Sequence, residues 1–152
     1  MNNLPTFELT QAIGFFINRA AFLMTDEMQR RIKASGHDLS TPDFSILYHI
    51  SQKGAMTQVN IANMMMRDKT TITRRIDGLV KKQYVTRVNN PDDRRVFLIT
   101  LTDSAHEALT SIIPLVAVFQ DEVLSDISEQ DKNITMQTLQ KISNTLIQAK
   151  EK

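Results

Sequence analysis

The side chains best suited to contact a nucleic acid lie within residues 68–82. Three apolar residues recur at helical spacing and predict one buried face of an α-helix: Ile72, Ile76 and Leu79. Asp68 precedes them, where its carboxylate can accept hydrogen bonds from the free N–H groups of the first turn. The opposite face combines a hydroxyl, an acid and two cations: Thr70, Arg74, Asp77 and Lys81. Hydroxyl and guanidinium groups can reach phosphates and base edges in a major groove, although a lone helix with such a face is more often only solvated.

A hairpin with a basic tip is predicted directly after this helix. Two β-prone runs, residues 84–88 and 94–101, flank a turn-forming segment that contains Pro91. Arg94 and Arg95 fall where the chain enters the second strand. A helix followed by such a hairpin is the layout of a winged helix-turn-helix, so the hairpin favours nucleic-acid contact over a merely solvated face.

Charge is unevenly distributed although the net charge is only +1. Residues 67–95 hold nine basic and four acidic side chains, whereas the rest of the chain holds nine basic and thirteen acidic ones. A basic middle between acidic ends is expected of a nucleic-acid face on a body that avoids the polyanion.

These features together resemble the MarR family of bacterial transcriptional regulators. The matching segments cover the helix, the basic wing and the Leu-Thr start of the next helix: residues 61–62, 68–74, 79–82, 92–95 and 98–102. The resemblance implies a single MarR-type chain over residues 1–152, mainly α with a small β-hairpin wing. It also implies a winged helix-turn-helix DNA-binding lobe over residues 40–101 and a helical dimerisation region over residues 5–36 and 102–150.

The same resemblance implies which residues contact DNA. In the recognition helix, the positions that meet bases and nearby phosphates are matched by Lys69, Thr70, Thr71, Thr73 and Arg74. Lys81 joins them from the polar face of that helix. In the wing, Arg95 matches the arginine of the minor groove, Asp93 the acid that orients it, and Arg94 a neighbouring backbone contact. The alternative for Asp93 and Arg95 is an ordinary surface ion pair.

Three positions depart from the family pattern. Met66 and Gln83 stand where glycines are common, which predicts non-glycine residues in tight turns with φ > 0. Arg75 replaces a commonly apolar residue, and we expect it either to reach a phosphate or to meet a partner in the neighbouring lobe.

Helix signals divide the remaining sequence. We expect a long first helix over residues 7–34, and further helices capped by Thr41, Thr57 and Ser128. A fifth helix is expected over residues 102–124, with a kink near Pro114 because an interior proline removes a hydrogen bond. The first, fifth and sixth helices are amphipathic with little left in one chain to cover them, so a second copy is their expected partner.

A small-molecule site is expected among apolar side chains of the first helix. The candidates are Phe15, Phe16, Phe22 and Met24. Such residues are more often core or dimer contacts, but family members commonly bind small aromatic effectors between the winged lobe and the dimer helices.

The sequence indicates no catalytic residue, metal site or cofactor. The absence of cysteine excludes disulfides, thiolate ligands and a thiol nucleophile. The three histidines, His37, His49 and His106, lack metal-ligand spacing. No apolar run reaches the length of a bilayer, and residues 1–5 do not resemble a signal peptide, so we expect a cytoplasmic protein without membrane contact.

The prediction from sequence is a sequence-specific DNA-binding transcriptional regulator, expected to be a repressor. It would bind a palindromic double-stranded operator as a homodimer and be released by a small aromatic effector. The alternative is a helical winged-fold module that binds protein without specific DNA binding.

Overall fold

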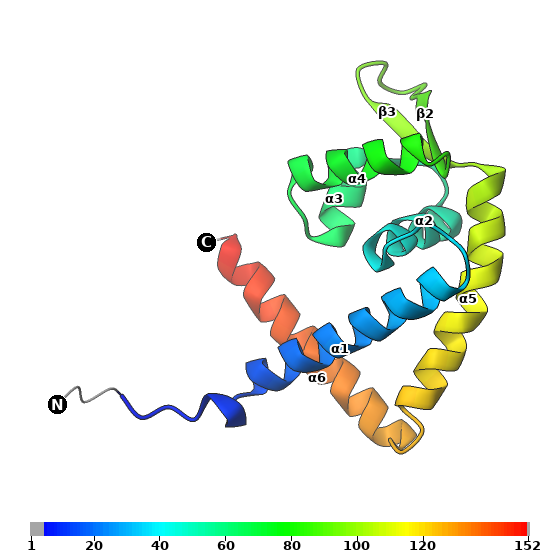
Figure 1. Cartoon of the computed structure of the whole chain (residues 1–152). Helices are drawn as coiled ribbons and strands as arrows, with labels where there is room; N and C mark the ends of the chain where they lie inside the picture. The colour runs from blue at the N-terminus through cyan, green and yellow to red at the C-terminus, as the bar shows by residue number, and fades with distance from the viewer. Residues whose placement is uncertain (1–4, 152) are drawn as a thin grey trace. The chain divides into compact units, whose positions relative to one another are not determined.

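The computed structural model describes residues 5–151 and divides into two compact units, with the boundary between Val116 and Ala117. The first unit holds these elements in chain order (Figure 1): η1 (Leu9–Gln11), α1 (Ile13–Ala34), α2 (Thr41–Lys53), β1 (Met56–Thr57), α3 (Gln58–Met65), α4 (Lys69–Lys81), β2 (Val85–Asn89), β3 (Phe97–Leu101) and most of α5 (Asp103–Val123). The second unit holds the end of α5 and α6 (Glu129–Lys150). Mainly helical structure with a small β-hairpin confirms the predicted fold class.

The predicted apolar stripe of α4 is the part of that helix which the core buries. Ile72 and Ile76 have no exposed surface, and Leu79 has almost none. The core around them includes fully buried side chains from α1, α2, α3, β3 and α5: Ile32, Ile46, Leu47, Ile61, Ile99 and Ile112. Burying one such side chain contributes about 1.5–3 kcal/mol. The stripe therefore fixes which face of α4 points away from the core.

The sheet has three antiparallel strands in the order β1–β3–β2. The hairpin pairs Val85 with Leu101 and Asn89 with Phe97, as the two β-prone runs predicted. It extends beyond α4 (Figure 1). The strand β1, whose Met56 pairs with Ile99, was not predicted from the sequence. A two-residue strand has no periodicity of its own, and only its pairing with β3 defines it.

The predicted capping residues are correct in all but one helix. Thr57 accepts a hydrogen bond from the Asn60 N–H at 3.1 Å, and Ser128 accepts one from the Asp131 N–H at 3.1 Å. Thr41 was the wrong choice for α2, because Ser40 accepts from the Asp43 N–H at 3.2 Å and Thr41 is already helical. Both adjacent hydroxyls suit the position, so residue type alone could not distinguish them.

The two unusual turns were predicted correctly. Met66 ends α3 with a φ of 52°, and Gln83 follows α4 with a φ of 63°. Both residues therefore lie in the left-handed region that favours glycine. The chain passes from α3 to α4, and from α4 to the wing, through slightly strained turns.

The first helix begins later than predicted. Residue 7 is not helical, and α1 starts only at Ile13, after η1 and an extended Ala12 with ψ of 134°. No side chain caps either start, so apolar periodicity carried the prediction too far toward the N-terminus. At the other end of the first unit, α5 starts at Asp103, and Thr102 accepts a hydrogen bond from the Ala105 N–H at 3.3 Å.

Pro114 lies inside α5 as the sequence implied, and the kink near it stays a prediction.

In the second unit, α6 buries none of its residues. The apolar residues that remain exposed along it are Ile134, Met136, Leu139, Leu146 and Ile147. Among the described helices, none is long and apolar enough to cross a membrane.

Candidate nucleic-acid interface

The outward face of α4 presents free cations. Lys69, Arg74 and Lys81 are exposed, and none of their side chains bonds to another described residue. The Thr70 side chain is also exposed, and no described residue bonds its hydroxyl. Charged and hydroxyl groups without intramolecular partners are available to phosphates and base edges.

On two further threonines of α4, the hydroxyl proton is already donated in a hydrogen bond within the chain. The Thr71 hydroxyl donates to the Asp68 carboxylate at 2.6 Å, and the Thr71 N–H donates to the same group at 2.8 Å. These two bonds, the hydroxyl bond first, lower the pKa of Asp68 below its usual value and confirm Asp68 as the cap of α4. The Thr73 hydroxyl donates to the Lys69 carbonyl at 2.9 Å. Thr71 and Thr73 can therefore only accept further hydrogen bonds.

One flank of α4 is tied to α3 and to the wing. The Gln58 amide of α3 donates to the Thr73 hydroxyl at 3.1 Å and accepts from the Arg87 guanidinium at 3.3 Å. Arg87, on β2, also forms an ion pair with Asp77 of α4. These roles of Gln58 and Arg87 were not predicted from the sequence, because their partners lie 10 to 29 residues away. Arg87 thus holds the wing strand against the recognition helix instead of presenting a free charge.

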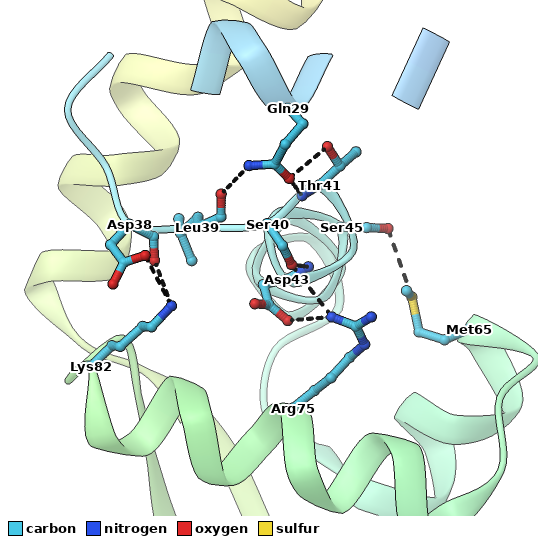
Figure 2. A network of polar contacts seen from close by, with 10 residues as sticks. All are labelled: Gln29, Asp38, Leu39, Ser40, Thr41, Asp43, Ser45, Met65, Arg75 and Lys82. Carbon is cyan, nitrogen blue, oxygen red and sulfur yellow. Dashed lines mark hydrogen bonds and ion pairs between the residues drawn. The ribbon is translucent and has the colours of Figure 1, made fainter. Parts of the chain in front are cut away.

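The opposite flank of α4 is tied to the start of α2 (Figure 2). Arg75 donates to the Asp43 carboxylate at 3.1 Å, and Lys82 donates to the Asp38 carboxylate at 3.1 Å. Gln29 of α1 continues this network, because its amide donates to the Leu39 carbonyl at 3.1 Å. Of the two roles expected for Arg75, contact with a protein partner is the one that its bond to Asp43 supports. That partner belongs to the same predicted lobe, not to the neighbouring one.

A hollow of about 370 Å³ opens on this second flank. Its lining comes from α2, α4 and the residue after α4: Asp43, Thr71, Arg74, Arg75, Gly78 and Lys82. Gly78 lies in the interior of α4, where glycine costs about 0.5–1 kcal/mol relative to alanine.

The tip of the wing carries an arginine that a neighbouring acid holds in place. The Arg95 N–H and guanidinium donate to the Asp93 carboxylate at 3.0 Å and 3.2 Å. These bonds, the side-chain one first, lower the pKa of Asp93 below its usual value. The Arg95 side chain remains 90% exposed, so the pair orients it without covering it. Arg94 is exposed beside it, and its side chain bonds to no other described residue.

The candidate effector residues are only partly brought together. A second hollow, of about 450 Å³, lies along α1 and is lined by Phe15, Asn18, Arg19, Phe22 and Leu23. Phe15 and Phe22 therefore share a surface. Phe16 and Met24 lie outside this lining, although the Phe16 ring meets that of Phe15 edge-on at 5.6 Å. Asn18 and Arg19 were not among the residues predicted from sequence, since only apolarity guided the choice, and Leu23 was assigned to the apolar stripe of the helix and not to the effector site.

Metal chemistry finds no support in residues 5–151. No group of three or more His, Cys, Asp or Glu side chains in this part of the chain could hold a metal ion.

Comparison with known proteins indicates that the chain is a regulator of transcription. The model of the MarR family matches residues 39–97. The HTH-type transcriptional regulator MhqR of Bacillus subtilis (strain 168) is 27% identical over 126 residues, which cover 83% of this chain and 86% of MhqR.

Solved structures show the same fold. BpsR of Bordetella bronchiseptica, whose DNA binding is regulated by 6-hydroxynicotinic acid, has a TM-score of 0.82 at 19% identity, covering 91% of this chain and 98% of BpsR. The transcriptional repressor CouR, bound to a 23-mer DNA duplex, has a TM-score of 0.81 at 21% identity, covering 93% of this chain and 99% of CouR. The matched family model covers residues 39–97, which include α4 and most of the wing, and the related proteins are HTH-type transcriptional regulators. Over these residues the chain is a domain of the MarR family of transcriptional regulators.

Proposed function

We propose that this regulator binds an imperfectly palindromic operator as a homodimer, and that it represses transcription until a small aromatic effector releases it. The observation that supports DNA binding is that two exposed features occur together. These are the unpaired cations of α4, Arg74 among them, and the Arg95 side chain that Asp93 holds outward. We propose no catalytic activity for the chain, and we place its action in the cytoplasm, where bacterial operators lie.

In this proposal α4 enters the major groove and the wing reaches the adjacent minor groove. Arg74 reads a base edge, and Thr70 offers a hydroxyl that can both donate and accept. Lys69, Lys81 and Arg94 contact phosphates. Thr71 and Thr73 accept from base or water donors, because their own protons are already committed.

A homodimer accounts for the apolar surface that the described chain leaves uncovered. Phe16 is 57% exposed and Phe22 68% exposed on α1, and α6 has no buried residue. Large exposed apolar surface on a soluble protein marks an interaction site. A two-fold dimer would place two recognition helices about 34 Å apart, matching successive turns of the major groove.

The effector proposal rests on the hollow along α1. Two aromatic rings line it together with the Arg19 guanidinium and the Asn18 amide, a combination that suits a flat ring bearing an acidic or polar group. A ligand there would act by favouring a dimer whose recognition helices are misplaced for DNA.

The test of DNA recognition is a fluorescence titration of the operator selected from genomic fragments. Arg74→Ala should weaken binding by about 5- to 150-fold and relax base preference, because a bidentate arginine–base contact contributes about 1–3 kcal/mol. Arg95→Ala should also weaken binding. Arg30→Ala, which removes an exposed arginine from α1, serves as the matched control and should bind as the wild type does. Equal affinity of all four proteins would refute the proposed surface.

The effector is tested with a panel of aromatic carboxylic acids that includes 6-hydroxynicotinic acid. A ligand should raise the melting temperature and lower operator affinity, and Arg19→Gln should lose that response while it keeps operator binding. If no compound changes either quantity, the effector proposal is wrong and the DNA-binding proposal stands.

A further inference from the structure

Gly78 is a glycine that its own chain does not require. It lies in the interior of α4, and a Cβ built on it would meet no heavy atom within 4 Å. Its φ is not positive, in contrast to those of Gly36 and Gly54. Neither packing nor backbone conformation within the chain explains a residue that weakens a helix.

The open side of Gly78 faces the hollow between α2 and α4. Thr71, Arg75 and Gly78 of α4 follow one another at spacings of four and three, so they form one stripe along this flank of the helix, and Arg74 lies beside it. Three cations and one acid line the hollow. Asp43 is balanced by Arg75 and Lys82 pairs with Asp38 outside the lining, whereas Arg74 has no described partner. The excess positive charge suits an anionic occupant.

The geometry of a helix in the major groove identifies that anion. The groove is about 12 Å wide and a helix with its side chains is about 10–12 Å in diameter. The flanks of a recognition helix therefore lie close to the sugar–phosphate backbones. A glycine on the flank of the helix lets one sugar–phosphate backbone come closer to the helix than any other residue type would allow.

The other flank of α4 offers no such approach. Thr73 and Asp77 carry side chains there, which bond to Gln58 and Arg87. The flank with Gly78 is thus the one on which a position of α4 lacks a side chain.

We propose that one strand of the operator packs its backbone directly against α4 at Gly78. A phosphate of that strand would sit in the hollow beside the Arg74 guanidinium. Gly78 is then a positioning residue that sets the depth of the recognition helix in the groove. This inference rests on the DNA binding proposed above, and it adds a contact that the side-chain chemistry of α4 does not reveal.

The test is Gly78→Ala, for which stability and binding should change in opposite directions. Removing a helix-interior glycine should raise the melting temperature by about 2–4 °C for a chain of this size. Operator affinity should fall by about tenfold or more, since a charge-assisted contact is lengthened or lost. The slope of log affinity against log salt should shrink by about one, as expected for a lost phosphate contact.

Gly14→Ala is the matched control, because Gly14 also lies in a helix and a Cβ added to it would likewise meet no heavy atom within 4 Å. It should leave operator affinity and the salt slope unchanged. A further readout uses operators in which single phosphates are replaced by neutral methylphosphonates. One position should weaken the wild type yet have no further effect on Gly78→Ala.

Each contrary result is informative. If Gly78→Ala is more stable but binds with unchanged affinity and salt slope, the inference is overturned while the proposed function stands. A lower melting temperature would show that the chain itself needs the glycine, and would also overturn it. If inorganic phosphate at constant ionic strength competes with the operator for the hollow, the hollow takes a free anion instead of the DNA backbone, and the inference is overturned. Failure of the wild type to select any operator would remove the proposed function itself.

Discussion

Replacing Arg75 by methionine should destabilise the chain because it breaks the ion pair that holds α4 to α2. Methionine keeps an apolar stem and removes the guanidinium group, with its charge and its hydrogen bonds to Asp43 and Ser40. The Arg75 side chain is 32% exposed and that of Asp43 is 15% exposed. Exposed pairs contribute about 0.2–1 kcal/mol, and breaking a buried pair costs about 3–5 kcal/mol. The half-buried position of this pair places the loss at about 1–2 kcal/mol, or about 2–8 °C in melting temperature.

The assay is urea unfolding followed by circular dichroism, because the sequence has no tryptophan and is rich in helix. Wild type, Arg75→Met, Asp43→Asn and the double variant form a cycle that isolates the coupling of the pair. All four proteins are measured at one concentration, since a dimer makes stability concentration-dependent. Arg94→Met, which removes an exposed arginine of the wing, is the control and should unfold like the wild type.

Two results would refute this reasoning. Additive losses in the double variant would show that the pair contributes nothing beyond its separate members. Unchanged stability of Arg75→Met together with a weaker, less salt-dependent operator complex would instead make Arg75 a phosphate contact.

Three further predictions concern the turns, caps and titration of the first unit. Gln83→Gly should raise the melting temperature by about 2–4 °C, because glycine adopts the φ of 63° without strain; a decrease would contradict this. Ser40→Ala should cost about 1 kcal/mol in urea unfolding and Thr41→Ala less, since Ser40 caps α2; the reverse order would restore Thr41 as the cap. Hydrogen bonds from Arg30 first lower the pKa of Glu27 from its usual 4.5 to about 2, so its contribution is present above pH 4.5 and is lost as the pH falls toward 2. The stability difference between wild type and Glu27→Gln should therefore shrink over that range, and a difference independent of pH would refute the assignment.

The local patterns of the sequence were sufficient for the recognition helix and the wing. The apolar spacing of α4, its Asp68 cap and the two β-prone runs all predicted elements that the structure contains. These signals depend on hydrogen bonds and side-chain contacts within a few residues, so the sequence displays them directly. The left-handed turns at Met66 and Gln83 were predictable for another reason, because the family commonly has glycine at both positions.

The DNA contacts themselves stay predictions, although the sequence located the surface that carries them. What it did not show is which polar groups are already engaged. Arg87 counts as one more positive charge in the sequence, and in the structure it is committed to Asp77 and Gln58. The hollow on α1 likewise joins Phe15 and Phe22 to polar residues that apolarity alone did not select.

The sequence by itself thus determined the type of fold, the orientation of α4 and the position of the basic hairpin. Only the tertiary structure decided the strand β1, the partner of Arg75 and the open side of Gly78. The physical reason is separation along the chain. Met56 meets Ile99, and Arg75 meets Asp43, across dozens of residues, so these contacts depend on how the packed core brings distant segments together.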